Sequence, residues 1–273
     1  MSPQICRSPQ PNELATILDQ AITWVKQAGE MALRDFESVK LLPLKADGTL
    51  LTTTDLKLEQ FLTNQIRLAY PDHNLLAEEG RYPQTRSPYT WGIDALDGTT
   101  CFVRGLPGWG ISVGLFYQSR PVMGLYHMPL LADLTYATPA GTYCNGQPLR
   151  KTVSSDWNGL GFLAVSAGAH YHFEINIPRI RALGNMNASL VYTARGSATA
   201  AFIPQARLWD IAAGVLILQQ AGGELRYLSG RPVDLTVLVN GCPTPEPIVA
   251  GHPLVVAEVR KAISSKTRLS RAT

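Results

Sequence analysis

Residues 91–115, WGIDALDGTTCFVRGLPGWGISVGL, constrain this chain more than any other stretch. The stretch begins with apolar residues, as a buried strand does, and then carries two acids, Asp94 and Asp97. Carboxylates at the end of a buried strand are costly unless positive charge neutralises them. The fold must therefore bring a compensating charge to this point.

A Gly98-Thr99-Thr100 turn follows the two acids directly. Its backbone N–H groups and hydroxyls suit an oxyanion. Acids beside an anion site are compatible with it when divalent metal ions lie between them, and all-oxygen ligands favour Mg²⁺ over zinc. The stretch therefore predicts a metal-assisted phosphate site.

Three blocks of the sequence carry a resemblance to one family. Residues 94–100 read DALDGTT, residues 77–80 read AEEG, and residues 208–214 read LWDIAAG, with Ala221-Gly222-Gly223 beyond. These blocks resemble the D-P-[LI]-D-G-T-T, G-E-E and W-D-x-A-A-G…A-G-G segments of the inositol monophosphatase family. They occur in the family's order with roughly its spacing, and the resemblance covers most of the chain.

The resemblance implies a phosphatase site that holds two or three Mg²⁺ ions. Its implied metal ligands are four carboxylates and one backbone carbonyl: Glu78, Asp94, Asp97, Asp210 and the carbonyl of Leu96. In such a site one ion activates a water molecule and another stabilises the leaving oxygen.

The resemblance also implies roles for residues that do not bind metal. Thr99 and Glu78 would position the attacking water, and Asp55 would orient the Thr99 hydroxyl. The expected substrate contacts come from two turns, and they are Gly98, Thr99, Thr100 and Ala198.

Several of these acids also have a structural interpretation. Asp55 could cap the helix that ends near residue 69, and Asp210 could cap a helix over residues 211–220. Adjacent residues on an extended segment point to opposite faces, so one of Glu78 and Glu79 should reach the site. Sequence physics does not choose between the two, whereas the resemblance implies Glu78.

The resemblance implies a layered αβαβα sandwich, like that of inositol monophosphatase and fructose bisphosphatase, which joins an α+β half to an α/β half. We place the halves at residues 1–152, with most metal ligands, and 153–273, with Asp210 and substrate contacts. Hydrophobic periodicity predicts helices and strands in both halves. The predicted helices cover residues 12–38, 196–203 and 211–220, and the predicted strands include 52–54, 75–77, 111–117, 122–126, 190–192 and two within 224–239.

Composition narrows the class of protein. Over 273 residues, 45% are hydrophobic, 16% are charged and the formal charge is +3, as in an ordinary globular protein. The basic residues are scattered, so no nucleic-acid partner is expected, and no apolar run of about 18 residues predicts a membrane span. Four dispersed cysteines without a C-x-x-C pair, and an N-terminus without a hydrophobic signal core, predict a cytoplasmic protein. The resemblance adds a homodimer and a small phosphorylated metabolite as partners.

The chain departs from the family pattern at two places. Cys101 stands where the family usually has Asn. The segment between Gly196-Ser197-Ala198 and Trp209 is short and contains no Asp or Glu, so a carboxylate that grips inositol hydroxyls is missing or comes from elsewhere. Arg195 or Arg207 could instead meet a second anionic group.

The substrate therefore stays open at this point. Thr100 favours the inositol-phosphatase branch of the family over the adenosine-bisphosphate branch, which more often has Lys there. The alternatives are phosphatases for histidinol phosphate, a sugar bisphosphate or adenosine 3′,5′-bisphosphate. A catalytically inactive scaffold or regulatory protein with the same fold is the alternative from another class.

Overall fold

The secondary structure comes from a computed structural model that describes residues 9–36, 38–46, 48–150, 152–157 and 160–266. The helices are α1 (Pro11–Asp35), α2 (Thr53–Ala69), α3 (Thr99–Val103), α4 (Ala169–His172), α5 (Met186–Ala194), α6 (Leu208–Gln220), α7 (Leu235–Val239) and α8 (Pro253–Lys261), with a 3₁₀ turn at Pro129–Leu131. The strands are β1 (Asn74–Ala77), β2 (Tyr89–Asp97), β3 (Gly110–Tyr117), β4 (Arg120–Met128), β5 (Asp133–Thr138), β6 (Gly141–Cys144), β7 (Gln147–Pro148), β8 (Leu163–Val165), β9 (Phe173–Ile175), β10 (Ile180–Ala182), β11 (Ala200–Ile203), β12 (Glu224–Tyr227), β13 (Ile248–Gly251) and β14 (Ile263–Ser265).

The strands of the described residues form three sheets. A seven-stranded sheet has the order β1-β2-β3-β4-β5-β6-β7, a five-stranded sheet has the order β10-β8-β11-β13-β12, and β14 pairs with β9. In the larger sheet β1 and β2 are parallel and the following neighbours are antiparallel. In the second sheet β10, β8 and β11 are parallel, whereas β13 is antiparallel to both β11 and β12.

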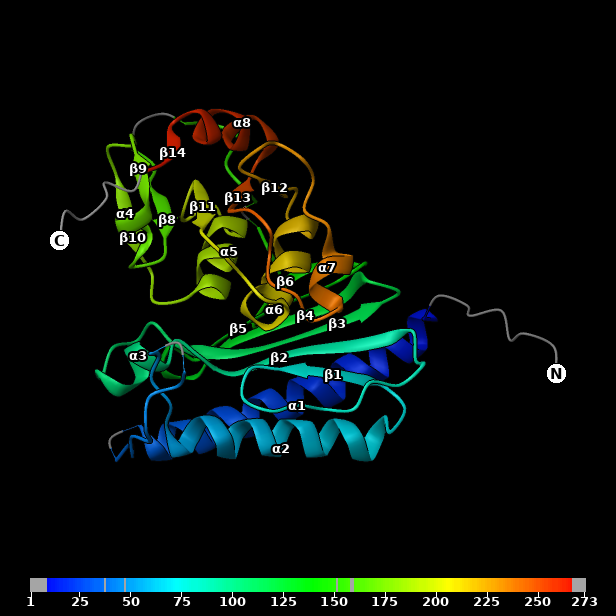
Figure 1. Cartoon of the computed structure of the whole chain (residues 1–273). Helices are drawn as coiled ribbons and strands as arrows, with labels where there is room; N and C mark the ends of the chain where they lie inside the picture. The colour runs from blue at the N-terminus through cyan, green and yellow to red at the C-terminus, as the bar shows by residue number, and fades with distance from the viewer. Residues whose placement is uncertain (1–8, 37, 47, 151, 158–159, 267–273) are drawn as a thin grey trace.

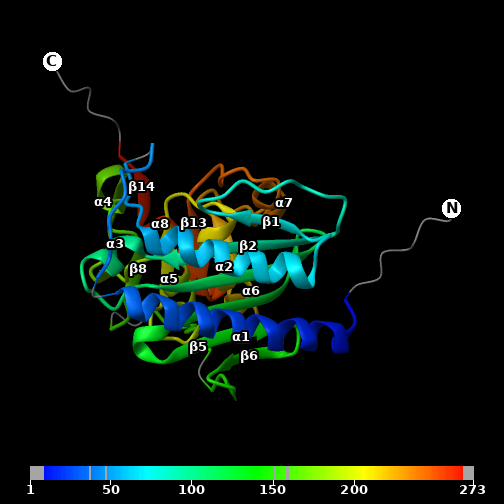
Figure 2. The ribbon, with the colours of Figure 1, turned by 90° about the horizontal axis from the view of Figure 1, so that it is seen from below.

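The elements stack in alternating layers of helix and sheet (Figure 1). Helices α1 and α2 cover one face of the seven-stranded sheet, α5 and α6 lie between the two sheets, and α8 covers the far face of the five-stranded sheet. Figure 2, which views the molecule from below, shows α1 and α2 side by side across their sheet. This arrangement is the predicted αβαβα sandwich.

The two halves of the chain supply different sheets but share a hydrophobic core. All strands of the seven-stranded sheet precede residue 152, and all strands of the five-stranded sheet follow it. One buried cluster joins Phe116 and Tyr126 of the first sheet to Leu190 of α5 and Ile211 of α6. The division into two domains at residue 152 stays a prediction.

The start of α2 differs from the sequence-based expectation. Thr53 and Thr54, predicted as part of a strand, form its first turn, because Thr52 caps the helix. The Thr52 side chain accepts hydrogen bonds from the N–H groups of Thr54 and Asp55, and Asp55 accepts one from the Thr52 N–H (2.8 Å). This reciprocal capping box outweighs the strand preference of three β-branched residues.

Three elements of the second half were also predicted wrongly. Residues 190–192 belong to helix α5 and residues 200–203 to strand β11, the reverse of the expected order. The Asn185 side chain starts α5 by accepting the Ala188 N–H (2.6 Å), and Gly196, at φ 68°, follows its end. Residues 235–239, expected in a strand, form α7, which begins where the Asp234 side chain accepts the Thr236 N–H (2.9 Å).

A row of three glycines brings α6 onto the seven-stranded sheet. Gly92, Gly114 and Gly124 are cross-strand partners on β2, β3 and β4. A Cβ atom at Gly114 would lie 2.4 Å from the Ala212 carbonyl oxygen, and one at Gly124 would lie 2.4 Å from that of Ala213. The backbone of α6 therefore packs directly on the backbone of β3 and β4, while Gly92 of β2 leaves room for the side chains of Ala212 and Leu208.

The cysteines of the described residues form no disulfide. Cys101, Cys144 and Cys242 are free thiols, while Cys6 lies outside the described residues. No helix in the described ranges combines the length and apolar character that crossing a membrane requires.

We expect Gly114→Ala to lower the free energy of unfolding by about 1–3 kcal/mol, because the added methyl group must push α6 away from the sheet. Urea denaturation of both proteins measures the change. Gly168→Ala is the matched control, since its added Cβ would meet only Tyr171, at 3.8 Å. Equal, small effects of the two substitutions would contradict the close packing of α6.

Candidate active site

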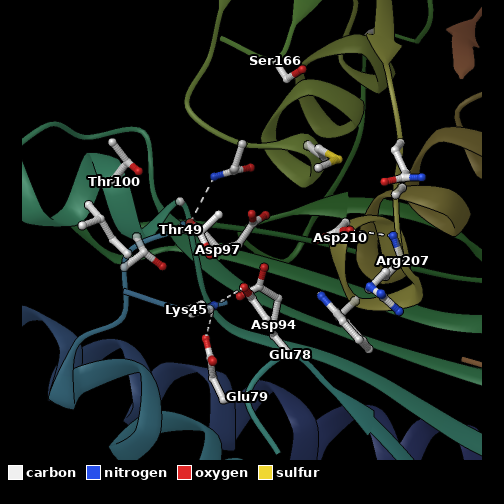
Figure 3. Close-up of a pocket in the computed structure, with 18 of the residues that line it drawn as sticks. Lys45, Thr49, Glu78, Glu79, Asp94, Asp97, Thr100, Ser166, Arg207 and Asp210 are labelled. Atoms are coloured by element: carbon white, nitrogen blue, oxygen red, sulfur yellow. Dashed lines mark hydrogen bonds and ion pairs between the residues drawn. The ribbon is translucent and has the colours of Figure 1, made fainter. Parts of the chain in front are cut away.

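A cleft of about 770 Å³ lies between the end of β2, the start of α6 and the loop before α2. Figure 3 shows Asp94, Asp97 and Glu78 at its centre, Thr100 to one side, and Asp210 with Arg207 to the other. The residues that line it include most of the predicted site together with others: Lys45, Ala46, Thr49, Leu50, Glu78, Glu79, Arg81, Asp94, Asp97, Gly98, Thr99, Thr100, Ser166, Gly184, Asn185, Met186, Gln205, Ala206, Arg207, Trp209 and Asp210.

A bulge in β2 brings Asp94 and Asp97 to the same cleft. Side chains three residues apart on a regular strand point to opposite faces. Here Asp94 pairs with Ser112 and Asp97 with Gly110, so β2 has one more residue than β3 between these pairs. The extra residue turns the second acid toward the first.

Both carboxyl groups are almost inaccessible to solvent. Asp94 is 3% exposed and Asp97 is 5% exposed. Burial raises the pKa of each well above its ordinary value, and the charges of Glu78 and Asp210 raise both further. The Asn187 amide, which donates to Asp97 Oδ2 (3.0 Å), opposes this rise for Asp97. The pair therefore favours any cation that enters the cleft.

Asp210 enters the cleft from the first turn of α6. Its Oδ2 accepts the backbone N–H of Arg207 (2.6 Å), so it helps to cap the helix, which begins at Leu208 and not, as predicted, after Asp210. Burial raises the pKa of Asp210 to about 7; the charge of Glu78 adds to this, whereas the Arg207 N–H and the charges of Arg207 and Lys45 act against it. A capping residue and a cleft acid are thus the same side chain.

Glu78 and Glu79 share one partner that the sequence reasoning missed. The Lys45 ammonium lies 2.5 Å from a carboxylate oxygen of each. The expectation that the two acids face opposite ways is wrong, because β1 ends at Ala77 and both acids lie in the bend that follows. Burial raises the pKa of Glu79 to about 7 although its bond to Lys45 opposes the shift.

The Thr99 hydroxyl contacts Asp55, which is distant from it in the sequence. It donates to Asp55 Oδ1 at 2.8 Å, while Asp55 Oδ2 accepts the N–H of Thr52. The turn before it requires a glycine: Gly98 has φ 94°, and a Cβ there would lie 2.6 Å from the Gly108 carbonyl oxygen. Asp55 therefore caps α2 and holds Thr99 at once.

Two asparagines that the sequence reasoning missed tie α5 to the acids. Asn185 Nδ2 donates to the Asp97 carbonyl oxygen (3.2 Å) and to the Tyr126 hydroxyl (2.7 Å). Asn187 Nδ2 donates to Asp97 Oδ2, and Asn187 Oδ1 accepts the Gly214 N–H of α6 (3.1 Å). Asn185 could have been recognised from the sequence as a possible helix cap. It was not, because residues 190–192 were predicted to form a strand.

Three predicted site residues do not line the cleft. Asp55 acts through Thr99, and the Leu96 carbonyl lies 3.2 Å from the Thr99 hydroxyl. Ala198 is fully buried in the core, and its N–H donates to the Tyr192 carbonyl oxygen, so the structure does not place it against a substrate. Cys101 lines a neighbouring apolar pocket.

The chemical type of the available ligand atoms in the cleft suits a hard divalent cation. The acids offer only oxygen atoms as ligands. Their pKa values are raised, so a positive charge in the cleft would stabilise their ionised forms. In the described residues, however, no three Asp, Glu, His or Cys side chains are gathered as a metal site. The Lys45 ammonium is the cation that faces Glu78.

Fold and cleft together define a layered α/β protein with acids gathered in one cleft. Comparisons with known proteins give the family of this fold. The model of the inositol monophosphatase family matches residues 13–264. Inositol monophosphatase 1 of Bos taurus is 31% identical over 241 residues, which cover 80% of this chain and 86% of that protein. The fructose-1,6-bisphosphatase/inositol-1-monophosphatase of Thermotoga maritima is 29% identical over 227 residues, covering 80% and 87%.

A solved structure has the same fold. The extragenic suppressor protein suhB from Bartonella henselae superposes with a TM-score of 0.78 at 22% identity, over 90% of this chain and 98% of that one. The chain therefore belongs to the inositol monophosphatase family.

We expect Asp94→Asn to raise the unfolding temperature of the metal-free protein and to reduce the rise that Mg²⁺ causes. The substitution keeps the side-chain volume but removes one buried negative charge. Differential scanning fluorimetry with EDTA and with MgCl₂ measures both effects.

Asp19→Asn on the exposed surface of α1 is the control and should match the wild-type protein in both conditions. An unchanged Mg²⁺ response in Asp94→Asn would show that Asp94 is not a metal ligand.

Proposed function

We propose that this protein is a Mg²⁺-dependent phosphomonoesterase of the inositol monophosphatase type that releases phosphate from a small metabolite. The observation that carries the proposal is the joint placement of Asp94, Asp97 and Asp210 beside the Gly98-Thr99 turn in one cleft. Family membership supports the same reaction class. A scaffold protein without activity would have no need to keep these buried charges together.

The proposed ligands of two or three Mg²⁺ ions are the carboxylates of Glu78, Asp94, Asp97 and Asp210 with the carbonyl of Leu96. When bound, Mg²⁺ would supply an activated water and charge neutralisation for the leaving oxygen. The chain itself stabilises the charged forms of two of these acids, because the Asn187 amide donates to Asp97 and the Arg207 backbone N–H donates to Asp210.

The proposed catalytic unit is Asp55, Thr99 and Glu78. Because the Thr99 hydroxyl donates its proton to Asp55, its lone pairs are free to accept a hydrogen bond from a water molecule. Glu78 would accept the second proton of that water. The N–H groups at the Gly98-Thr99-Thr100 turn open α3 and have no partners within the helix, so they would bind the phosphate oxygens.

We also propose a cytoplasmic location and a homodimer. Unpaired Cys101, Cys144 and Cys242 fit a reducing compartment. Leu106 and Leu131, which are 51% and 48% exposed, line an apolar pocket of about 470 Å³ beside the cleft. We propose that this exposed apolar surface contacts a second copy of the chain.

Phosphate release with and without Mg²⁺ tests the enzyme proposal on inositol 1-phosphate, histidinol phosphate, fructose 1,6-bisphosphate and adenosine 3′,5′-bisphosphate. We expect Mg²⁺-dependent release from one compound above the others. Asp97→Asn should abolish it while circular dichroism stays unchanged, and Asp19→Asn should retain it. Full activity of Asp97→Asn would remove the site assignment, and an inactive wild-type protein would favour the scaffold alternative.

Light scattering coupled to size-exclusion chromatography tests the dimer. The wild-type mass should equal two chains, and Leu131→Glu should shift it toward one. Leu68→Glu, on the exposed side of α2, should leave the mass unchanged. A wild-type protein that elutes as one chain at every concentration would contradict the dimer.

A further inference from the structure

The acids of the cleft lie together on one side, where Lys45 pairs with two of them. These acids come from the bend after β1, the end of β2 and the first turn of α6, and they are Glu78, Glu79, Asp94, Asp97 and Asp210. The wall formed by the ends of β8, β10 and β11 contributes Ser166, Asn185 and Gln205, which are neutral, and Arg207. A substrate phosphate held at the acid end would thus have its remainder facing a wall without a carboxylate.

The segment that contributes Gln205 and Arg207 to this wall cannot supply an acid. Residues 196–207 contain no Asp or Glu, and the next acid along the chain is Asp210 itself. Carboxylates are the strongest acceptors for the hydroxyl groups of a polyol, so recognition by such acceptors is unavailable from this segment. The cationic side chain in it that faces the cleft is Arg207.

Arg207 is held at the cleft by contacts on either side of its side chain. Its backbone N–H donates to Asp210, its Nη1 donates to the Gly241 carbonyl oxygen (3.2 Å), and its Cζ lies 5.6 Å from the centre of the Trp209 ring. A guanidinium has five N–H donors. Among the described residues only one of these five has a hydrogen-bond partner, so a fork of donors is left at the cleft wall.

Arg195, the other arginine considered from the sequence, is committed elsewhere. Its two terminal nitrogens contact Asp133 at 2.6 and 2.5 Å, and Nη2 also contacts Thr135 and Cys144. The Arg195 side chain is only 14% exposed and does not line the cleft. The geometry therefore favours Arg207 over Arg195 as the partner of a second anionic group, a choice that the sequence left open.

We propose that the substrate carries a second oxyanion, a phosphate or a carboxylate, and that the Arg207 guanidinium binds it. This inference rests on the proposed phosphatase function and narrows its substrate from any phosphorylated metabolite to a doubly anionic one. The planar fork of Arg207 matches the paired oxygens of either group. The cleft, at about 770 Å³, has room for a sugar bisphosphate.

Matched substrate pairs test the inference with Mg²⁺ present. Fructose 1,6-bisphosphate is compared with fructose 1-phosphate and fructose 6-phosphate, and 3-phosphoglycerate is compared with glycerol 3-phosphate. The wild-type enzyme should have the higher kcat/KM for the doubly anionic member of at least one pair. The first pair reports a second phosphate, and the other pair reports a carboxylate.

Arg207→Gln should lower that preference about ten- to hundredfold, the loss expected for charge-assisted hydrogen bonds, mainly through KM. Arg207→Lys should restore part of it, since the charge is kept but the fork is lost. Arg81→Gln removes another cleft arginine, which contacts the Gly80 carbonyl oxygen, and should keep the preference. A guanidinium that merely balanced the charge of Asp210 would affect both members of a pair equally.

Product inhibition gives a second readout that is independent of turnover of the tested compound. The product of a doubly anionic substrate retains the second oxyanion, so its inhibition constant should rise in Arg207→Gln and not in Arg81→Gln. Phosphate release with no preference in the wild-type enzyme, or a preference unchanged by Arg207→Gln, would overturn this inference alone. No Mg²⁺-dependent release from any member would remove the proposed function and this inference together.

Discussion

Two carboxylates buried at the end of one strand are the constraint on which the rest of the structure depends. Asp94 and Asp97 are nearly inaccessible, and burial disfavours their charged forms. Several contacts stabilise the two carboxylates. Asp97 accepts a hydrogen bond from the Asn187 amide, and Asp94 accepts one from the N–H of Leu96 (3.2 Å). The start of α6 also faces the pair. A cation in the cleft would stabilise the negative charge that remains.

Much of the site could be predicted because its acids fall in short, contiguous blocks. Glu78, Asp94, Asp97, the Gly98-Thr99-Thr100 turn and Asp210 were named from the sequence, and the structure gathers them in one cleft. The bulge in β2 could not be predicted, since a spacing of three places two side chains on opposite faces of a regular strand. Lys45, Asn185 and Asn187 were missed because their partners lie far away along the chain, 90 residues in the case of Asn187 and Asp97.

The fold was predicted best where the hydrophobic pattern is long. The 25 residues of α1 bury a stripe of apolar residues at helical spacing, so its period is unmistakable. Helix α5 and strand β11 are buried almost throughout, polar residues such as Asn187 and Thr193 included, because both are enclosed by other elements. A segment buried on all sides has no polar face to reveal its period, and this explains why helix and strand were exchanged.

The glycine row beneath α6 has a consequence for how the cleft tolerates change elsewhere. Because Gly114 and Gly124 let main chain meet main chain, the separation of α6 from β3 and β4 is set by peptide atoms, whose size is the same in every sequence. At Gly92 on β2 the neighbours are instead the side chains of Ala212 and Leu208. The position of Asp210 relative to Asp94 therefore depends on those two side chains as well, because a change of volume is felt in a close-packed interior.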